Sequence, residues 1–180
     1  MRIISGKYKG KRLVAPKKLP VRPTTDMAKE GLFNILTNRY NFSDLVILDL
    51  FTGTGNISFE FASRGVRSIT AVDAHYACLG YIKKITKELD LPIETIKSDV
   101  YNYLSKSNQK ANIIFADPPY DFSDEDFSKI AELVFANNLL HEDGLLIIEH
   151  SKYTSLEHAP YYIEHRKYGG SVFSFFKNEN

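Results

Sequence analysis

The chain has 180 residues, of which 43% are hydrophobic, and this length is typical of a single domain with a substantial core. No stretch approaches the roughly 20 apolar residues of a membrane span, and the first residues are too polar for a secretory signal, so a cytoplasmic protein is expected. The single cysteine, Cys78, excludes an internal disulfide and argues against a cysteine-built metal site. We expect no metal ion.

A net charge of +1 conceals a basic amino-terminal segment. Residues 1–22 hold eight of the 23 Lys and Arg residues and no acid, which leaves 15 basic against 22 acidic residues in the remainder, or +8 against −7. A basic arm on an acidic body predicts a polyanionic partner, with a solvated tail as the alternative. The residues expected to contact nucleic acid are Arg2, Lys7, Tyr8, Lys9, Lys11, Arg12 and Arg22.

The basic segment also has the pattern of a short β-hairpin. Ile3 and Ile4 on one side and Leu13 and Val14 on the other flank the glycine-containing residues 6–10. At the tip, the aromatic ring is expected to stack on a base while the lysines contact phosphates. We therefore predict a basic extension over residues 1–22 and a main domain over residues 23–180.

Strands and helices alternate through the main domain. After a helix that begins near residue 26, continuous or alternating apolar runs predict five strands, and a hairpin follows around Gly169 and Gly170. The predicted strands are residues 45–50, 68–72, 93–96, 112–116, 145–148, 161–168 and 172–176. This order indicates an α/β fold, a doubly wound and mainly parallel seven-stranded sheet with an antiparallel hairpin strand at its carboxyl-terminal end.

Acidic residues stand in or just past the ends of five predicted strands: Asp49, Asp73, Asp99, Asp117 and Glu149. In doubly wound sheets, ligands bind at the carboxyl ends of the strands. One acid there is usually structural, but five in register are harder to dismiss because uncompensated buried carboxylates are costly. The pattern predicts a ligand site at this edge.

The loop after the first strand contains two glycines, Gly53 and Gly55, which allow the backbone to approach a ligand closely. A dinucleotide-binding fingerprint would require a third glycine where Ser58 stands, and this counts against a nicotinamide cofactor. The carboxylate of Asp49, four residues before Gly53, favours a methyl donor whose amino acid end carries an ammonium group.

Two further acids are predicted to bind a nucleoside. Asp73 is placed to accept hydrogen bonds from both hydroxyls of a ribose. Asp99 is placed either to accept from the exocyclic amine of adenine or to cap the helix that begins at Val100, and we give these two interpretations equal weight.

The fourth strand ends in Asp117-Pro118-Pro119-Tyr120. An exocyclic amine on a base is a poor nucleophile, and it is activated when a carboxylate and a backbone carbonyl accept hydrogen bonds from its NH2 group. Prolines hold such a carbonyl rigidly and add no competing donor, while a tyrosine can stack on a flipped base. A rigid turn with a capping acid is the alternative. We predict that Asp117 and the Pro118 carbonyl orient an amine and that Tyr120 covers the base.

Together these residues resemble the class I S-adenosylmethionine-dependent methyltransferases, and the D-P-P-Y motif is that of the branch that modifies amino groups. Residues 2–13, 21–26 and 32–36 narrow the resemblance to the bacterial RsmD family. This resemblance implies S-adenosylmethionine as cofactor and methylation of the N2 amine of a guanine in 16S ribosomal RNA. The implied partner is 16S RNA or an assembling 30S subunit, with the enzyme as a monomer.

The chain departs from the usual family pattern at several places, including His75 and Tyr76, which stand in a usually charged stretch. Thr52 and Thr54 accompany the loop glycines, Asp73 stands where Glu is usual, and Met27 and Lys29 replace arginines. A DNA amino-methyltransferase is the alternative with the same chemistry, but 180 residues leave no room for its target-recognition domain. A non-catalytic RNA-binding or assembly protein of the same fold is the alternative without chemistry.

Overall fold

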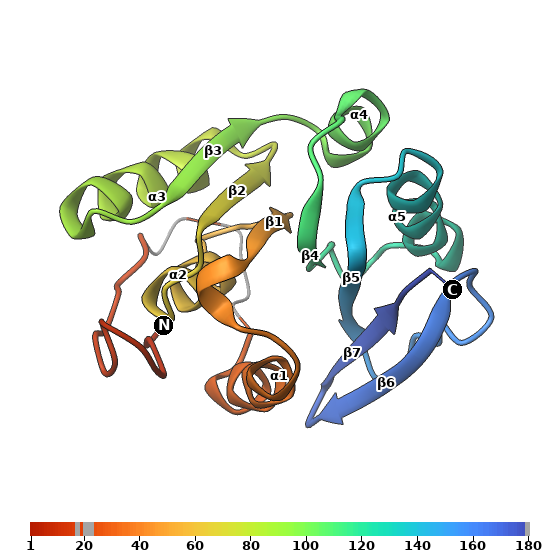
Figure 1. Ribbon diagram of the computed structural model, residues 1–180, viewed down its shortest axis with the longest axis horizontal. Helices are drawn as coiled ribbons and strands as arrows, with labels where there is room; N and C mark the ends of the chain where they lie inside the picture. Colours follow the sequence, from red (N-terminus) through yellow and green to blue (C-terminus); the bar gives the residue numbers. More distant parts are fainter. Residues whose placement is uncertain (17–18, 20–23, 179–180) are drawn as a thin grey trace.

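The computed structural model describes residues 1–16, 19 and 24–178. Its centre is a seven-stranded sheet with the order β3-β2-β1-β4-β5-β7-β6 (Figure 1). The strands are β1 (Val46–Leu50), β2 (Ser68–Asp73), β3 (Ile93–Lys97), β4 (Ala111–Ala116), β5 (Leu140–Ser151), β6 (Tyr162–Tyr168) and β7 (Ser171–Phe176). The first five run parallel, and β7 is antiparallel to both of its neighbours. The predicted α/β fold is confirmed.

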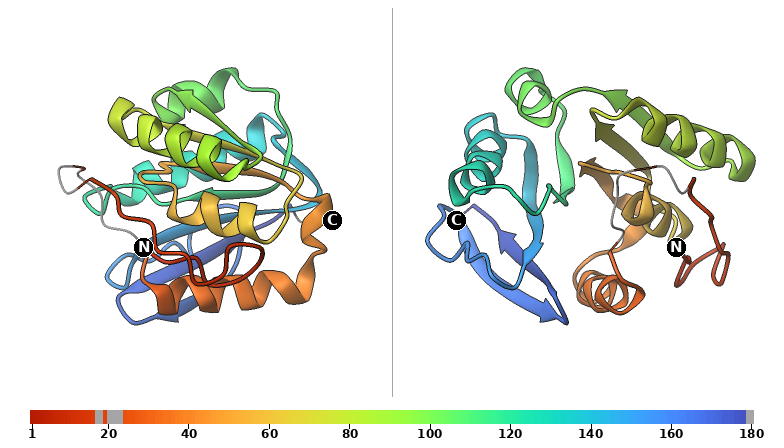
Figure 2. Two further views of the ribbon diagram at one scale, coloured as in Figure 1. Left: turned by 90° about the vertical axis from the view of Figure 1, so that its left-hand side faces the viewer. Right: turned by 180° about the vertical axis from the view of Figure 1, so that it is seen from behind.

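Helices cover both faces of this sheet (Figures 1 and 2). The α1, α2 and α3 helices pack one apolar cluster against the first face, whereas α4 and α5 pack a second cluster against the other. Their bounds are α1 (Asp26–Arg39), α2 (Asn56–Ser63), α3 (Tyr76–Leu89), α4 (Val100–Lys106) and α5 (Asp124–Ala136), with a 3-10 turn η1 (Phe42–Asp44) before β1. None of the helices in the described ranges has the length and apolarity needed to cross a membrane.

Local signals explain where α1 begins and why it contains a glycine. The Thr25 side chain accepts a hydrogen bond from the Ala28 N–H at 3.2 Å and so caps the first turn. A Cβ on Gly31 would lie 2.2 Å from the ring of Tyr168. Gly31 therefore weakens the helix but allows it to lie close against β6.

Strand β5 is longer than its apolar run predicts. The expected strand covered residues 145–148, with Glu149 just past its end, but β5 continues to Ser151. The reason is its neighbour β7, which pairs Phe173 with Glu149 and Val172 with His150. Glu149 thus lies within a central strand, which corrects the prediction.

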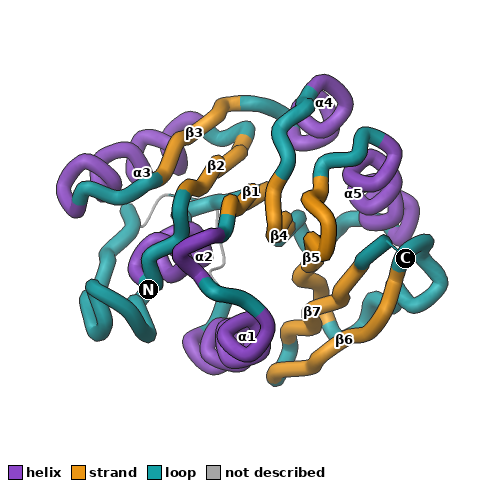
Figure 3. Tube along the Cα trace, in the orientation of Figure 1, coloured by secondary structure: helices purple, strands orange, loops and turns teal. Residues whose placement is uncertain are grey.

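The amino-terminal extension forms a turn with one antiparallel bridge, between Arg2 and Arg12, rather than two extended strands (Figure 3). Its two apolar ends, Ile3 and Leu13, are buried in the same cluster as the helices of the first face. At the tip, the Lys7 N–H donates to the Ser63 carbonyl of α2 at 2.7 Å. The extension is therefore attached to the main body at its ends and at its tip.

Candidate active site

A cavity of about 520 Å³ opens at the carboxyl ends of β1, β2 and β4. Its volume lies within the range of small-molecule sites. Most of the predicted ligand-binding residues line it, namely Asp49, Gly53, Asp73, Asp99, Asp117, Pro118 and Tyr120. Gly55 and Glu149 are not among the lining residues, whereas Thr24, Thr52, Asn56 and Cys78 are lining residues that the sequence analysis did not assign to the ligand site.

Asp49 lies at the base of this cavity and is 1% exposed. Its carboxylate accepts hydrogen bonds from the hydroxyl groups of Thr52, at 2.7 Å, and Ser58. Burial raises the pKa of Asp49 to about 6, and the two hydroxyl donors oppose that rise. Ser58, which the sequence presented only as a missing glycine, therefore supports a carboxylate of the site.

Asp73 organises the glycine loop. One of its carboxylate oxygens accepts the Gly53 N–H at 2.8 Å, and the other accepts the His75 N–H at 2.7 Å. The carboxylate thus ties the end of β2 to the turn after β1. Because Asp73 also lines the cavity, the loop and the carboxylate present a preformed surface to a ligand.

Three residues of the glycine loop, Phe51, Gly53 and Gly55, have left-handed backbone conformations. Gly55 has a φ of +78°, and a Cβ there would lie 2.9 Å from Ile82 of α3, so glycine is required for both the turn and the packing. Phe51 has a φ of +55°, a conformation that costs a non-glycine residue roughly 1–3 kcal/mol. The turn into α2 therefore stores strain beside the cavity.

The Asp99 side chain accepts the Asn102 N–H at 2.9 Å, which confirms the capping interpretation. Asp99 is exposed and also lines the cavity. Its proposed contact with adenine stays a prediction.

The D-P-P-Y motif follows β4 directly. The Asp117 N–H donates to the Leu50 carbonyl at 3.4 Å, which joins the motif to the end of β1. Within the turn it is the Pro119 carbonyl that accepts the Phe122 N–H, at 3.1 Å. Pro118 is buried, and Tyr120 is 44% exposed at the mouth of the cavity. The turn therefore holds an acid and an aromatic ring on one cavity wall.

Asp117 has an unusual electrostatic environment. Desolvation raises the pKa of its carboxyl group well above the usual value, and the negative charges of Glu149 and Asp49 raise it further. A carboxylate with a raised pKa is a stronger proton acceptor than an ordinary one.

Glu149 lies beside Asp117 on the next strand. The register pairs Ala116 with Ile148, which places the following residues, Asp117 and Glu149, at neighbouring positions. Glu149 is 1% exposed and accepts a hydrogen bond from the Thr24 hydroxyl at 2.6 Å. The sequence correctly predicted an acid at this edge of the sheet, but Glu149 does not line the cavity.

The Cys78 thiol also faces this region, and burial raises its pKa to about 11. The thiol is therefore a packing group rather than a nucleophile. Among the described residues, no three His, Cys, Asp or Glu side chains come together in a way that would hold a metal ion.

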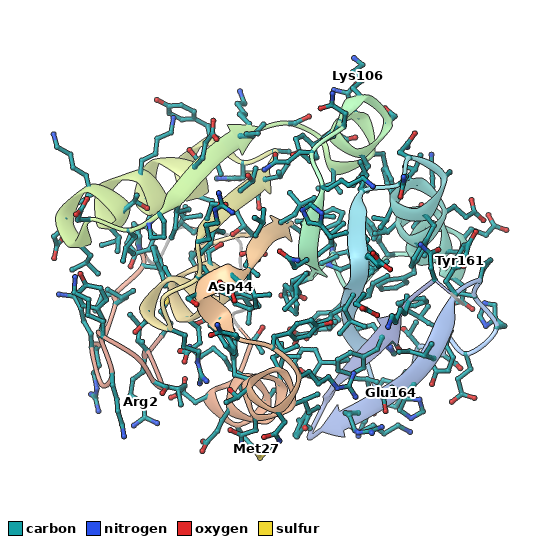
Figure 4. The ribbon with its side chains drawn as sticks, viewed as in Figure 1. Arg2, Met27, Asp44, Lys106, Tyr161 and Glu164 are labelled. Carbon is teal, nitrogen blue, oxygen red and sulfur yellow. The ribbon has the colours of Figure 1, made fainter. Side chains whose placement is uncertain are left out.

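Most of the cations predicted to bind RNA are on the surface of the extension. Arg2, Lys7, Lys9 and Arg12 are exposed, and Figure 4 shows the Arg2 side chain at the outer edge of the molecule. Two cations have acidic partners: Arg2 contacts Asp26 at 3.2 Å and Lys11 contacts Glu88 at 3.7 Å. The predicted contact at Arg22 lies outside the described residues.

Tyr8, which was expected to stack on a base, is half-buried. Its hydroxyl donates to the Leu89 carbonyl at 2.5 Å, and its N–H donates to the Ser63 hydroxyl at 3.0 Å. These contacts give Tyr8 an anchoring role that the sequence did not predict.

Comparisons with known proteins agree on one group of relatives. A family model described as "Conserved hypothetical protein 95" matches residues 1–177. The ribosomal RNA small subunit methyltransferase D of Buchnera aphidicola (subspecies Baizongia pistaciae) is 33% identical over 83% of this chain and 75% of its own. A putative rRNA methyltransferase of Bacillus subtilis, YlbH, is 32% identical over 87% of this chain and 85% of its own. The structure of the putative methyltransferase YhhF from Escherichia coli superposes with a TM-score of 0.87, at 24% identity, over 100% of this chain and 98% of that one.

Proposed function

The chain belongs to the RsmD family, and on that premise we propose that it methylates the N2 amine of a guanine in 16S ribosomal RNA, with S-adenosylmethionine as the methyl donor. Its relatives carry names of ribosomal RNA methyltransferases, which support the coarser function of rRNA methylation. The finer specificity is what the resemblance to the RsmD family implies, and the chemistry of the cavity supports methylation of an amino group.

The cavity residues fit the proposed cofactor. Asp73 offers carboxylate oxygens beside the glycine loop, Asp99 offers a second carboxylate, and Asp49 supplies negative charge at the base. A nucleoside with two ribose hydroxyls, an amine and an ammonium group has donors for all three acids. The cofactor supplies a methyl group on a sulfonium, a leaving group that needs no metal.

The protein residues contribute position and a proton acceptor. Asp117 and the Pro118 carbonyl accept hydrogen bonds from the guanine NH2 group and direct its lone pair toward the methyl carbon. With S-adenosylmethionine bound, its sulfonium would supply the methyl group to the amine nitrogen, and Asp117 would receive the proton that this nitrogen loses. Positioning of the two reactants accounts for most of the rate in such a transfer. Tyr120 stacks on the flipped base.

One observation carries this proposal: a single cavity brings the Asp73 and glycine-loop surface together with the Asp117–Tyr120 wall. A cofactor-binding protein without catalysis needs the first surface and has no use for the second. The exposed cations of the extension support an RNA substrate, because they contact phosphates irrespective of sequence. We further propose that the enzyme acts in the cytoplasm, as a monomer, on 16S RNA or an assembling 30S subunit.

The proposal is tested by transfer from methyl-labelled S-adenosylmethionine to four substrates: naked 16S RNA, 30S particles, 23S RNA and double-stranded DNA. We expect label in 16S RNA or 30S particles, and nucleoside analysis should recover it as N2-methylguanosine. Label on adenine or in DNA alone would refute the proposed specificity. Calorimetry with the cofactor at high protein concentration tests the non-catalytic alternative. A methyltransferase must bind the cofactor, so absence of binding would favour that alternative.

A further inference from the structure

A buried ion pair holds the beginning of the amino-terminal extension. Lys29 of α1 and Glu60 of α2 are 1% and 0% exposed, and their charged groups are 3.6 Å apart. The Glu60 carboxylate accepts the N–H groups of Ile4, at 2.8 Å, and Ser5, at 3.0 Å. The Lys29 ammonium donates to the Arg2 carbonyl at 2.6 Å. Residues 2–5 are thus bound directly to this pair.

Thr24, at the start of the main domain, is bound to the same ammonium group through one intermediate. Lys29 donates to the side-chain oxygen of Asn56 at 2.9 Å, and the Asn56 amide donates to the Thr24 carbonyl at 2.9 Å. The Thr24 hydroxyl then donates to Glu149 at 2.6 Å. A continuous line of hydrogen bonds therefore runs from the extension to the strand beside Asp117.

Burying this charged pair costs desolvation free energy, which an element that only stabilises the fold does not need to spend. Burial lowers the pKa of Lys29 against the opposing charge of Glu60, which shows that desolvation is the larger effect. Apolar side chains of similar volume usually stabilise such a position as well or better. What apolar side chains do not do is direct a hydrogen bond to a chosen carboxylate.

We propose that Thr24 is a positioning residue for the methyl transfer. It lines the cavity, and its hydroxyl fixes Glu149 while its carbonyl is held by Asn56. Glu149 in turn is the neighbour of Asp117 in the register of β4 and β5. Thr24, at the start of the main domain, therefore belongs to the active site, and the buried ion pair that binds residues 2–5 of the extension is linked through Asn56 and Thr24 to the carboxylate beside Asp117. This inference rests on the proposed function.

The test compares Thr24→Val, which keeps the shape and removes the hydroxyl, with Thr24→Ser, which keeps the hydroxyl. Thr25→Ala is the control, because it removes the cap of α1 one residue away without a contact to Glu149. We expect Thr24→Val to lower kcat on RNA about 10- to 100-fold, the range for loss of a hydrogen bond to a charged group. Its KM for RNA and its Kd for S-adenosylmethionine should stay within about threefold of wild type, as befits a positioning role.

Rescue distinguishes positioning from loss of structure. Thr24→Ser should keep kcat within about threefold of wild type, and Thr25→Ala should lower the melting temperature but not kcat. Wild-type kcat in Thr24→Val, or an equal loss in cofactor affinity, would overturn the inference and leave the proposed function standing. A wild-type enzyme that transfers no methyl group to any RNA would overturn the proposed function itself.

Discussion

The acids of the cavity fall into two groups that differ in their partners. Asp73 and Asp99, the rim acids, accept hydrogen bonds from backbone N–H groups of the glycine loop and of the starts of α3 and α4. Asp49, Asp117 and Glu149, the inner acids, lie on or directly after neighbouring strands, with Glu149 outside the cavity lining, and side-chain hydroxyls hold Asp49 and Glu149. The same residue type at one sheet edge thus has two uses. Rim acids shape loops around a ligand, whereas inner acids create a site in which ionisation is shifted.

The largest expected effect is at the inner acid of the D-P-P-Y motif. Asp117→Ala should lower the rate of methyl transfer by at least about 10³-fold, because both the acceptor for the amine and the proton acceptor are lost. The Kd for S-adenosylmethionine should change less than about threefold, since the rim acids hold the cofactor. Single-turnover transfer and calorimetry measure the two quantities. Asp121→Ala, at an exposed acid four residues on, is the matched control, and a fully active Asp117→Ala protein would contradict this role.

The second prediction concerns stability and pH at Asp49. Its folded-state pKa of about 6 exceeds the ordinary value of 3.8, so the folded state binds more protons between these values and the free energy of unfolding falls as pH rises through that window. Asp49→Asn lacks this titration. Its stability relative to wild type should rise by up to about 3 kcal/mol from pH 4 to pH 7. Urea unfolding at several pH values measures the difference in stability between the two proteins. A difference that does not change with pH would mean that burial does not raise the pKa of Asp49.

For the rim acid Asp73, we expect the main effect on the affinity for the cofactor rather than on the rate of methyl transfer. Asp73→Ala removes the acceptor of the Gly53 and His75 N–H groups and should weaken cofactor binding about 10- to 100-fold through loss of charged hydrogen bonds. With saturating cofactor, transfer should recover to within a few-fold of wild type. Asp121→Ala again controls for a surface acid. If Asp73→Ala lost kcat and kept its cofactor affinity, the division into rim and inner acids would be wrong.

The smallest effect separates the two interpretations of Asp99. Asp99→Ala should cost about 0.5–2 kcal/mol of stability through loss of the cap on α4, while Asp99→Asn should retain the cap. In Asp99→Asn the remaining amide donor faces the cavity, so cofactor affinity should fall a few-fold if this carboxylate accepts from adenine. Thermal unfolding and calorimetry on both variants give the answer. Unchanged cofactor affinity in Asp99→Asn would mean that Asp99 caps α4 but does not bind adenine.

The sheet was predictable because the parallel strands are short segments of continuous or alternating apolar residues between turn signals. The exception is instructive: Leu145 to Ile148 marks only the middle of β5, and the partner strand β7 decides that the ladder continues through Glu149 to Ser151. Pairing between strands distant in sequence has no local signature. The insertion of β7 between β5 and β6 was hidden for the same reason.

The cavity acids were predictable because topology alone brings strand ends to one edge. Their supporting residues were not, since Thr24 and Glu149 are 125 residues apart and Ser58 looked like a defect in a glycine motif. One signal was available. Lys29 occupies a position on the same helical face as Leu32, Phe33 and Leu36, and a charged residue on a core face indicates a buried partner.

The 125-residue span between Thr24 and Glu149 has a consequence for synthesis of the chain. During translation, the extension and the glycine loop leave the ribosome early, and folding units form from the amino-terminal end. Glu149 follows much later, and its strand is completed only when β7 can pair with it. On the proposed function, an unfinished chain already carries the cations that hold RNA but lacks the carboxylate arrangement that methylates it. On the proposed function, we therefore expect methyl transfer only after β7 has paired with β5.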